Sequence, residues 1–123
     1  MFELKVTSHF AAAHQLTMVA KKCENLHGHN WKIEVRIAGN RLNSAGVVMD
    51  FGEIKQQVRA IMKTLDHKFL NDLEYFHDGN PSSENIAKYI AETLQIKITN
   101  PDVWVASVTS WESEDACATY FPE

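Results

Sequence analysis

The apolar residues of this chain recur with two spacings, one typical of strands and the other of helices. Apolar and polar residues alternate over about residues 2–10, and again over residues 29–37, up to a turn signal at Gly39-Asn40. Because successive side chains of a strand point to opposite faces of a sheet, both stretches predict half-buried strands. Residues 11–26 follow neither spacing and are expected to form a loop that carries functional side chains.

Two stretches in the middle of the chain have the helical spacing. Asp50, with Glu53 in the capping-box position, predicts the start of the first helix. The apolar face of this helix is formed by Ile54, Val58, Ile61 and Leu65. The second helix is expected to begin at residues 82–84 and to stop at Asn100-Pro101. Its apolar face includes Ile86, Ile90 and Leu94.

Two further strands are predicted near the C-terminus, over residues 103–111 and 116–121. The order β-β-α-α-β-β indicates an α+β fold in a single domain over residues 1–123, with an antiparallel four-stranded sheet covered on one face by two helices. Neither proline nor a strong run of charge protects the edges of such a sheet. Subunits are therefore expected to pair through these edges and to form a homo-oligomer.

Composition argues against several classes of partner. The 123 residues carry a formal net charge of -4, which argues against nucleic acid or an anionic membrane as the main partner. No stretch approaches the roughly 18 uninterrupted apolar residues of a membrane span. Two cysteines without an export signal are typical of reduced thiols in the cytosol. One of them, Cys117, lies in a predicted strand and is expected to be buried.

The candidate chemistry lies in residues 23–29, which read Cys-Glu-Asn-Leu-His-Gly-His. If the chain is extended here, His27 and His29 point to the same side and can bind one metal ion together. His14 can supply a third imidazole, which leaves the fourth position of a tetrahedral zinc ion open. Spacing alone leaves two roles for Cys23: the fourth ligand of a closed structural site, or a free thiolate beside the metal in a catalytic one.

Several motifs together resemble the 6-pyruvoyltetrahydropterin synthase family. The resemblance begins at residues 10–14 and 23–29, and it continues in the same order through residues 48–51, 65–67, 80–85 and Glu112. The gap of three residues between Cys23 and His27 is similar to that of the bacterial branch that forms 6-carboxytetrahydropterin in the queuosine pathway. The resemblance implies the tunnelling fold, in which the sheets of several subunits join into barrels. Trimeric barrels stack as a hexamer, with active sites between subunits.

The resemblance also implies a role for each candidate residue. The implied zinc ligands are His14, His27 and His29. Cys23 becomes the catalytic thiol, assisted by Asp66 and His67, and Glu112 binds the amidine-like edge of a pterin ring. Asp66 and His67 are sequence neighbours that would not face each other within a helix, so the first helix must end before them. The break in helical spacing at this point agrees with that requirement.

The implied reaction converts 7,8-dihydroneopterin triphosphate into 6-carboxytetrahydropterin, with loss of triphosphate and acetaldehyde. The redox change is internal to the substrate, so no nicotinamide or flavin is needed, and the chain has no glycine-rich phosphate loop. Zinc held by three neutral histidines would act as a Lewis acid towards the side chain of the substrate.

One departure from the family pattern, the open role of Glu24 and three rival interpretations remain. Gln15 stands where many relatives have arginine; if that arginine assists with phosphates, Lys21 or Lys22 would have to compensate. Glu24 lies next to Cys23, and one branch of the family uses a glutamate in place of the catalytic cysteine. The same scaffold can form 6-pyruvoyltetrahydropterin or perform an aldolase-like cleavage of the side chain. The rival from another class is a non-enzymatic, zinc-stabilised oligomerisation or ligand-binding module.

Overall fold

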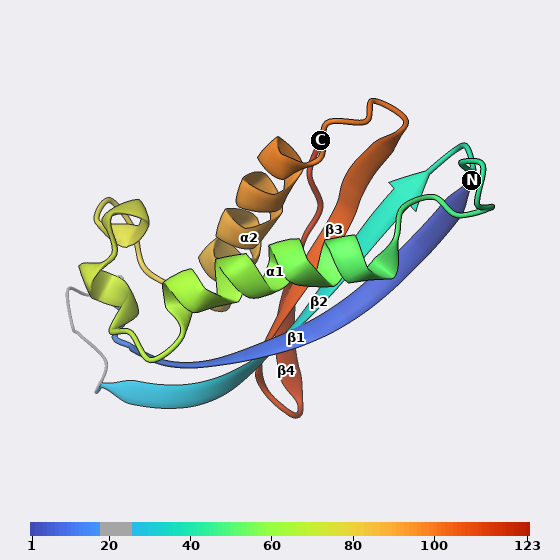
Figure 1. The fold of residues 1–123 in the computed structure, drawn as a ribbon. Helices are drawn as coiled ribbons and strands as arrows, with labels where there is room; N and C mark the ends of the chain where they lie inside the picture. The colour runs from blue at the N-terminus through green and yellow to red at the C-terminus, as the bar shows by residue number, and fades with distance from the viewer. Residues whose placement is uncertain (18–25) are drawn as a thin grey trace.

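The computed structural model describes residues 1–17 and 26–123, which form a four-stranded sheet with two helices on one face (Figure 1). The first half of the chain contains β1 (Phe2–His14), β2 (His27–Gly39) and α1 (Phe51–Leu65). Two short 3-10 helices, η1 (Leu70–Asp72) and η2 (Glu74–Phe76), lead to α2 (Ser83–Lys97), and β3 (Val103–Ser113) and β4 (Ala116–Tyr120) complete the fold. The predicted α+β order is confirmed.

The sheet is antiparallel with the strand order β1-β2-β3-β4, so β1 and β4 are its edges. The pairing of β1 with β2 continues to the His14–His27 pair, and it includes Ala12 opposite His29. The predicted loop over residues 11–26 is therefore wrong for residues 11–14, which belong to β1. The run of alanines hides the alternation, because alanine fits both faces of the sheet, and pairing with β2 decides where the strand ends.

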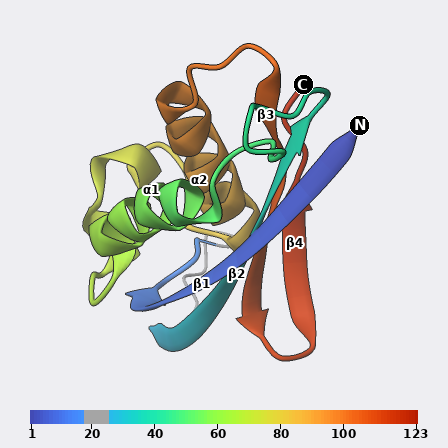
Figure 2. The ribbon, with the colours of Figure 1, turned by 45° about the vertical axis from the view of Figure 1, so that its right-hand side comes forward.

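The hydrophobic core lies between the helices and one face of the sheet, and Figure 2 shows both helices on that side. The sheet contributes four fully buried side chains of β2, which are Trp31, Ile33, Val35 and Ile37. The predicted helical faces are buried against them, namely Ile54, Val58, Ile61, Leu65, Ile86, Ile90 and Leu94. Both helical patterns are confirmed, since a 3.6-residue period places these side chains on one side of each helix.

The two helices begin with different caps. Within the described residues, Asp50 precedes α1 without a side-chain capping hydrogen bond, so the predicted capping box is wrong. The Asp50 carboxylate instead lies over Gly52, where a Cβ atom would sit 3.0 Å from Oδ2. At α2 the hydroxyl of Ser82 accepts a hydrogen bond from the Asn85 backbone at 3.1 Å. This cap anchors the residues just before α2, which belong to the candidate site.

The face of the sheet opposite the helices has no covering element among the described residues, and it corrects the prediction for Cys117. Cys117 pairs with Trp111, which in turn pairs with the exposed Lys32, so all three lie on this outer face. Cys117 is exposed, not buried. Alternation assigns a side chain to a face but does not say whether that face is covered. In the part of the chain that the structure describes, no helix is long and apolar enough to cross a bilayer.

Candidate functional site

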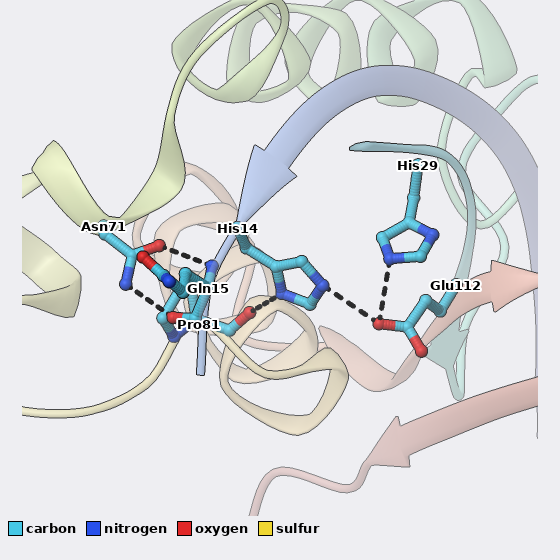
Figure 3. A network of polar contacts seen from close by, with 6 residues as sticks. All are labelled: His14, Gln15, His29, Asn71, Pro81 and Glu112. Atoms are coloured by element: carbon cyan, nitrogen blue, oxygen red, sulfur yellow. Dashed lines mark hydrogen bonds and ion pairs between the residues drawn. The ribbon is translucent and has the colours of Figure 1, made fainter. Parts of the chain in front are cut away.

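Three candidate side chains meet where the end of β1, the start of β2 and the end of β3 lie together (Figure 3). Oε1 of Glu112 is 3.1 Å from Nε2 of His14 and 3.5 Å from Nε2 of His29. The three donor atoms all lie within 4.8 Å of one another. Glu112 sits between Trp111 and Ser113, where the register of β3 with β4 shifts. An irregularity of this kind redirects a side chain locally.

The surroundings of His14 determine which ring nitrogen faces the cluster. The residue is 1% exposed, and its Nδ1 lies 2.8 Å from the backbone oxygen of Pro81. A carbonyl oxygen only accepts hydrogen bonds, so Nδ1 carries a proton; if the ring bears no second proton, Nε2 presents a lone pair. That lone pair points at a carboxylate oxygen of Glu112, which is also an acceptor. Such an arrangement is stable only with a positive charge between the two atoms, either a proton or a metal ion.

A divalent metal ion fits this donor set. Four ligands at about 2.0–2.1 Å from a tetrahedral zinc ion lie about 3.3 Å from one another. The distances of 3.1 and 3.5 Å between the histidine nitrogens and Glu112 Oε1 are close to that spacing. A carbonyl bonded to the second nitrogen of a histidine is also the usual outer partner of a metal-bound imidazole, because it fixes the tautomer and the ring orientation.

His27 lies beside this cluster. Its ring is nearly parallel to that of His29, with centroids 5.7 Å apart, and it is 6.4 Å from the ring of His14. His27 and His29 therefore lie on the same side of β2, as the two-residue period predicts. Among the described residues, however, the donor group within 4.8 Å contains Glu112 and not the exposed His27.

Asp66 and His67 form a second polar group at the end of α1. Oδ2 of Asp66 lies 2.9 Å from Nδ1 of His67, and its Oδ1 accepts a hydrogen bond from the Ala11 backbone at 2.8 Å. The hydrogen bond from Ala11, and then that from His67, lower the pKa of Asp66 below its usual value of 3.8. Asp66 ends the helix and His67 has a φ of 56°. The predicted end of the helix before this pair is confirmed.

One member of the polar pair and one member of the histidine cluster line a pocket of about 520 Å³. His29 and His67 both line it, together with the end of β1 and the start of β2. The pocket exists because the chain after α1 docks on the outer edge of β1. The Ala13 amide donates to Lys68 O at 3.0 Å, and the His67 amide donates to Ala11 O at 2.6 Å. The pocket therefore brings His67 near His29, while the other members of the two groups do not line it.

Comparison with known proteins agrees with this geometry. The family described as 6-pyruvoyl tetrahydropterin synthase matches residues 3–123 of the chain. The chain belongs to the 6-pyruvoyl tetrahydropterin synthase family. It is 37% identical to the putative 6-carboxy-5,6,7,8-tetrahydropterin synthase of Archaeoglobus fulgidus, over 92% of this chain and 90% of that protein. It is 35% identical to the dihydroneopterin monophosphate aldolase of Pyrococcus furiosus, over 86% of this chain and 85% of that protein.

Two further relatives bear the family name itself. The chain is 36% identical to 6-pyruvoyl tetrahydrobiopterin synthase of Drosophila melanogaster over 67% of its own length, and it spans about half, 51%, of that protein. The structure of Caenorhabditis elegans 6-pyruvoyl tetrahydropterin synthase superposes with a TM-score of 0.87 at 27% identity, covering 99% of this chain and 96% of that one. The predicted family and the tunnelling fold of the chain are confirmed, and so, at the level of the family, is the expectation of an enzyme.

Four residues to which the sequence analysis gave a role fall outside the residues that the structure describes. These positions are Lys21, Lys22, Cys23 and Glu24. Gln15 is described, and its backbone bonds to the side chain of Asn71. Sequence reasoning missed both Asn71 and the carbonyl of Pro81, because a hydrogen bond to backbone leaves no pattern of spacing. The proximity of Glu112 to His14 was also missed. The antiparallel order of the strands could have indicated it, because that order brings the end of β1, the start of β2 and the end of β3 to the same end of the sheet.

Proposed function

We propose that this protein is a zinc-dependent lyase that converts 7,8-dihydroneopterin triphosphate into 6-carboxy-5,6,7,8-tetrahydropterin, with release of triphosphate and acetaldehyde. This reaction would place it in queuosine biosynthesis. The observation that carries the proposal is the buried His14 ring, whose Nδ1 is bonded to Pro81 and whose Nε2 faces another acceptor. Support for the product comes from the Archaeoglobus relative, whose name specifies the carboxy compound.

In this proposal His14, His27 and His29 hold the zinc ion. A bound zinc ion would act as a Lewis acid towards the hydroxyl groups of the pterin side chain. The ring of His27 already lies beside that of His29, which makes it the nearest further imidazole of the described residues on this side of β2. Neutral imidazoles would leave the full dipositive charge of zinc available to the substrate.

Glu112 is the proposed anchor of the pterin ring. Its carboxylate is about one-third exposed, so it can leave the two histidines when zinc and substrate are bound. A carboxylate facing the guanidine-like edge of a pterin forms two parallel, charge-assisted hydrogen bonds, which fix the orientation of the ring. This role would place the side chain of the substrate towards the histidines.

Asp66 and His67 are the proposed proton carriers together with Cys23. The Asp66 carboxylate holds the proton on Nδ1 of His67 at 2.9 Å, which leaves Nε2 of that ring free to accept or donate a proton. In this proposal the thiolate of Cys23 takes a proton from carbon. A bound zinc ion would supply a positive charge that lowers the pKa of a neighbouring thiol and so favours the thiolate form.

The experiment that tests this function is product analysis. Purified protein is incubated with 7,8-dihydroneopterin triphosphate, and the pterins and aldehydes are identified by mass spectrometry. We expect a 6-carboxytetrahydropterin together with acetaldehyde and triphosphate. A pyruvoyl product without acetaldehyde would contradict the proposed reaction in favour of 6-pyruvoyltetrahydropterin synthesis.

Aldolase-like cleavage is the second candidate, and it is favoured by the Pyrococcus relative named as an aldolase. A retro-aldol reaction breaks a carbon–carbon bond of the side chain and leaves the oxidation state of the ring unchanged. The product would then still be a 7,8-dihydropterin, whereas the proposed reaction gives a tetrahydropterin. The ultraviolet spectrum of the product under anaerobic conditions therefore distinguishes the two.

A further inference from the structure

The chain that follows His14 is held by two asparagine side chains. Asn71 accepts a hydrogen bond from the Gln15 amide at 2.9 Å and donates one to the Gln15 carbonyl at 2.7 Å (Figure 3). Asn80 does the same at Thr17, with distances of 2.8 and 2.9 Å. We call Asn71 and Asn80 the asparagine clamp.

The asparagine clamp extends the edge of β1 beyond its last strand residue. A carboxamide offers one acceptor and one kind of donor side by side, as a peptide group of a neighbouring strand does. The chain after α1 already bonds Ala11 and Ala13 from this side. Together with Gln15 and Thr17, every second residue from 11 to 17 has a backbone hydrogen bond to this part of the chain. This spacing is the two-residue period of a strand.

Hydrogen bonds consequently hold His14 both through the backbone of its neighbours and through its ring. Its neighbours Ala13 and Gln15 are bonded through Lys68 and Asn71, and its Nδ1 is bonded to the carbonyl of Pro81. Pro81 follows directly after Asn80, so the residue that bonds Thr17 also precedes the carbonyl that orients the ring.

The clamp is itself anchored to α2. The side chain of Asn85 donates a hydrogen bond to the backbone oxygen of Asn80 at 2.7 Å. The amide of Asn85 donates to Ser82, which caps the helix. We infer that the direction in which Nε2 of His14 points depends on the start of α2, which Asn80 joins to the chain after β1.

We propose that Asn71 and Asn80 are positioning residues that aim the buried His14 ring at the metal ion, an inference that rests on the proposed function of the histidine cluster. Each side chain forms its hydrogen bonds to the backbone of Gln15 or Thr17, and would act on His14 through these residues or through Pro81. Outer partners that orient a metal-binding histidine typically change metal affinity by about 10–100-fold when they are replaced.

The test measures the metal affinity of Asn71→Ala and Asn80→Ala against a matched control, Asn43→Ala. Asn43 also accepts hydrogen bonds from backbone amides, those of Ala45 and Val47 at 2.9 and 3.3 Å, but in the turn after β2. The zinc dissociation constant is measured by competition with a chromophoric chelator. The visible spectrum of bound Co²⁺ reports the coordination geometry, and urea unfolding of the metal-free proteins reports stability.

We expect the zinc dissociation constant to rise about 10–100-fold in Asn71→Ala and in Asn80→Ala, with an altered Co²⁺ spectrum in each. Asn43→Ala should keep the affinity and the spectrum of the unmodified protein. A purely structural clamp would lower the stability of the two variants and leave both metal readouts unchanged, and that result would overturn the proposal.

Asn71→Asp keeps the inference testable if the alanine variants do not fold. It retains the acceptor for the Gln15 amide and loses the donor to the Gln15 carbonyl, so the rise in the dissociation constant should be smaller than in Asn71→Ala. Unchanged affinity in this folded variant would also count against the clamp. If the unmodified protein bound neither zinc nor Co²⁺, the proposed function would fail, and with it the metal centre that the clamp is inferred to position.

Discussion

The chemistry of the site depends first on which atoms of single residues face one another. His14 has its Nδ1 proton committed to Pro81, so its Nε2 can only accept a proton or bind a metal ion. His29 and Glu112 are placed to complete a donor group around that atom, and His27 stands next to it. The structure therefore leaves a choice between His27 and Glu112 as the third ligand, and this choice can be tested directly.

His27→Ala should lose zinc, whereas Glu112→Gln should keep it and lose affinity for pterin. The reason is that three imidazoles are the proposed ligands and the carboxylate is the proposed pterin anchor. Zinc per subunit is measured by elemental analysis after dialysis, and pterin binding by fluorescence titration. The opposite pattern, with full zinc in His27→Ala and zinc loss in Glu112→Gln, would make Glu112 the third ligand.

Cys23→Ala should keep stoichiometric zinc and lose turnover. A general base positioned at the reacting carbon typically contributes about 10²–10⁴-fold to the rate, so a loss of this size is expected. Zinc content and the steady-state rate are measured on the same preparation. Loss of the metal along with activity would indicate instead that the thiol is the fourth ligand of a closed site.

Asp66 makes a prediction about stability in acid. Its pKa is lowered in the folded protein, chiefly by the Ala11 amide, so its ionised form stabilises the fold at pH values above the usual value of 3.8 that applies to the unfolded chain. This contribution is lost as the pH falls through the lower, folded-state pKa. The difference in unfolding free energy between the unmodified protein and Asp66→Asn should therefore be constant near neutrality and shrink in acid.

Urea unfolding at a series of pH values measures this difference. Asp78→Asn, which changes an exposed carboxylate, serves as the matched control and should follow the unmodified protein. A difference for Asp66→Asn that persists unchanged into strong acid would show that the hydrogen bond from Ala11 does not depend on the charge of the carboxylate.

At the scale of elements, burial decided which predictions from sequence were right. The faces of α1 and α2 follow from the repetition of large apolar residues, because each face packs against the sheet. The end of β1 does not follow, since residues 11–13 are alanines and carry no alternation. The exposure of Cys117 does not follow either, because alternation cannot show which face of the sheet the helices cover.

The candidate site could be predicted only in part for a related reason. His27 and His29 lie on the same side of β2, and this could be predicted because residues two apart in an extended backbone point the same way. The approach of Glu112 to His14 depends on the strand register and on a shift of that register beside Glu112. The spacing of apolar and polar residues predicts neither of them. The contacts of Asn71 and Pro81 join residues far apart in the chain, through backbone atoms that every residue possesses.

At the scale of the whole molecule, the uncovered strand edges are the surfaces through which we expect subunits to associate. The chain after α1 bonds β1 at Ala11 and Ala13, which leaves the earlier part of this edge, around Thr7, for a neighbour. The edge strand β4 is the surface that we expect to pair with it. His67 is 81% exposed in the single chain, in agreement with a pocket that a neighbouring subunit completes.

The protein should therefore be a homo-oligomer in solution, with a mass that is a multiple of the 14.0 kDa subunit and, by family resemblance, a hexamer built as a dimer of trimers. The amides of Ala11 and Ala13 point outward from the β1 edge, and the two-residue period places that of Thr7 on the same side. Thr7→Pro removes this amide and should lower the mass of the oligomer in solution. Thr7→Ala is the control that keeps the amide. Light scattering after gel filtration makes the measurement, and a monomer at micromolar concentration would contradict this assembly.

The central claim is that three imidazoles hold a zinc ion whose remaining position is open and that Cys23 stays unbound. X-ray absorption spectroscopy at the zinc edge of the substrate-free protein tests it most directly. We expect three nitrogen neighbours from imidazole at about 2.0–2.1 Å and one light, exchangeable ligand, with no sulfur shell. A sulfur neighbour at about 2.3 Å would contradict it, because the cysteine would then close the site.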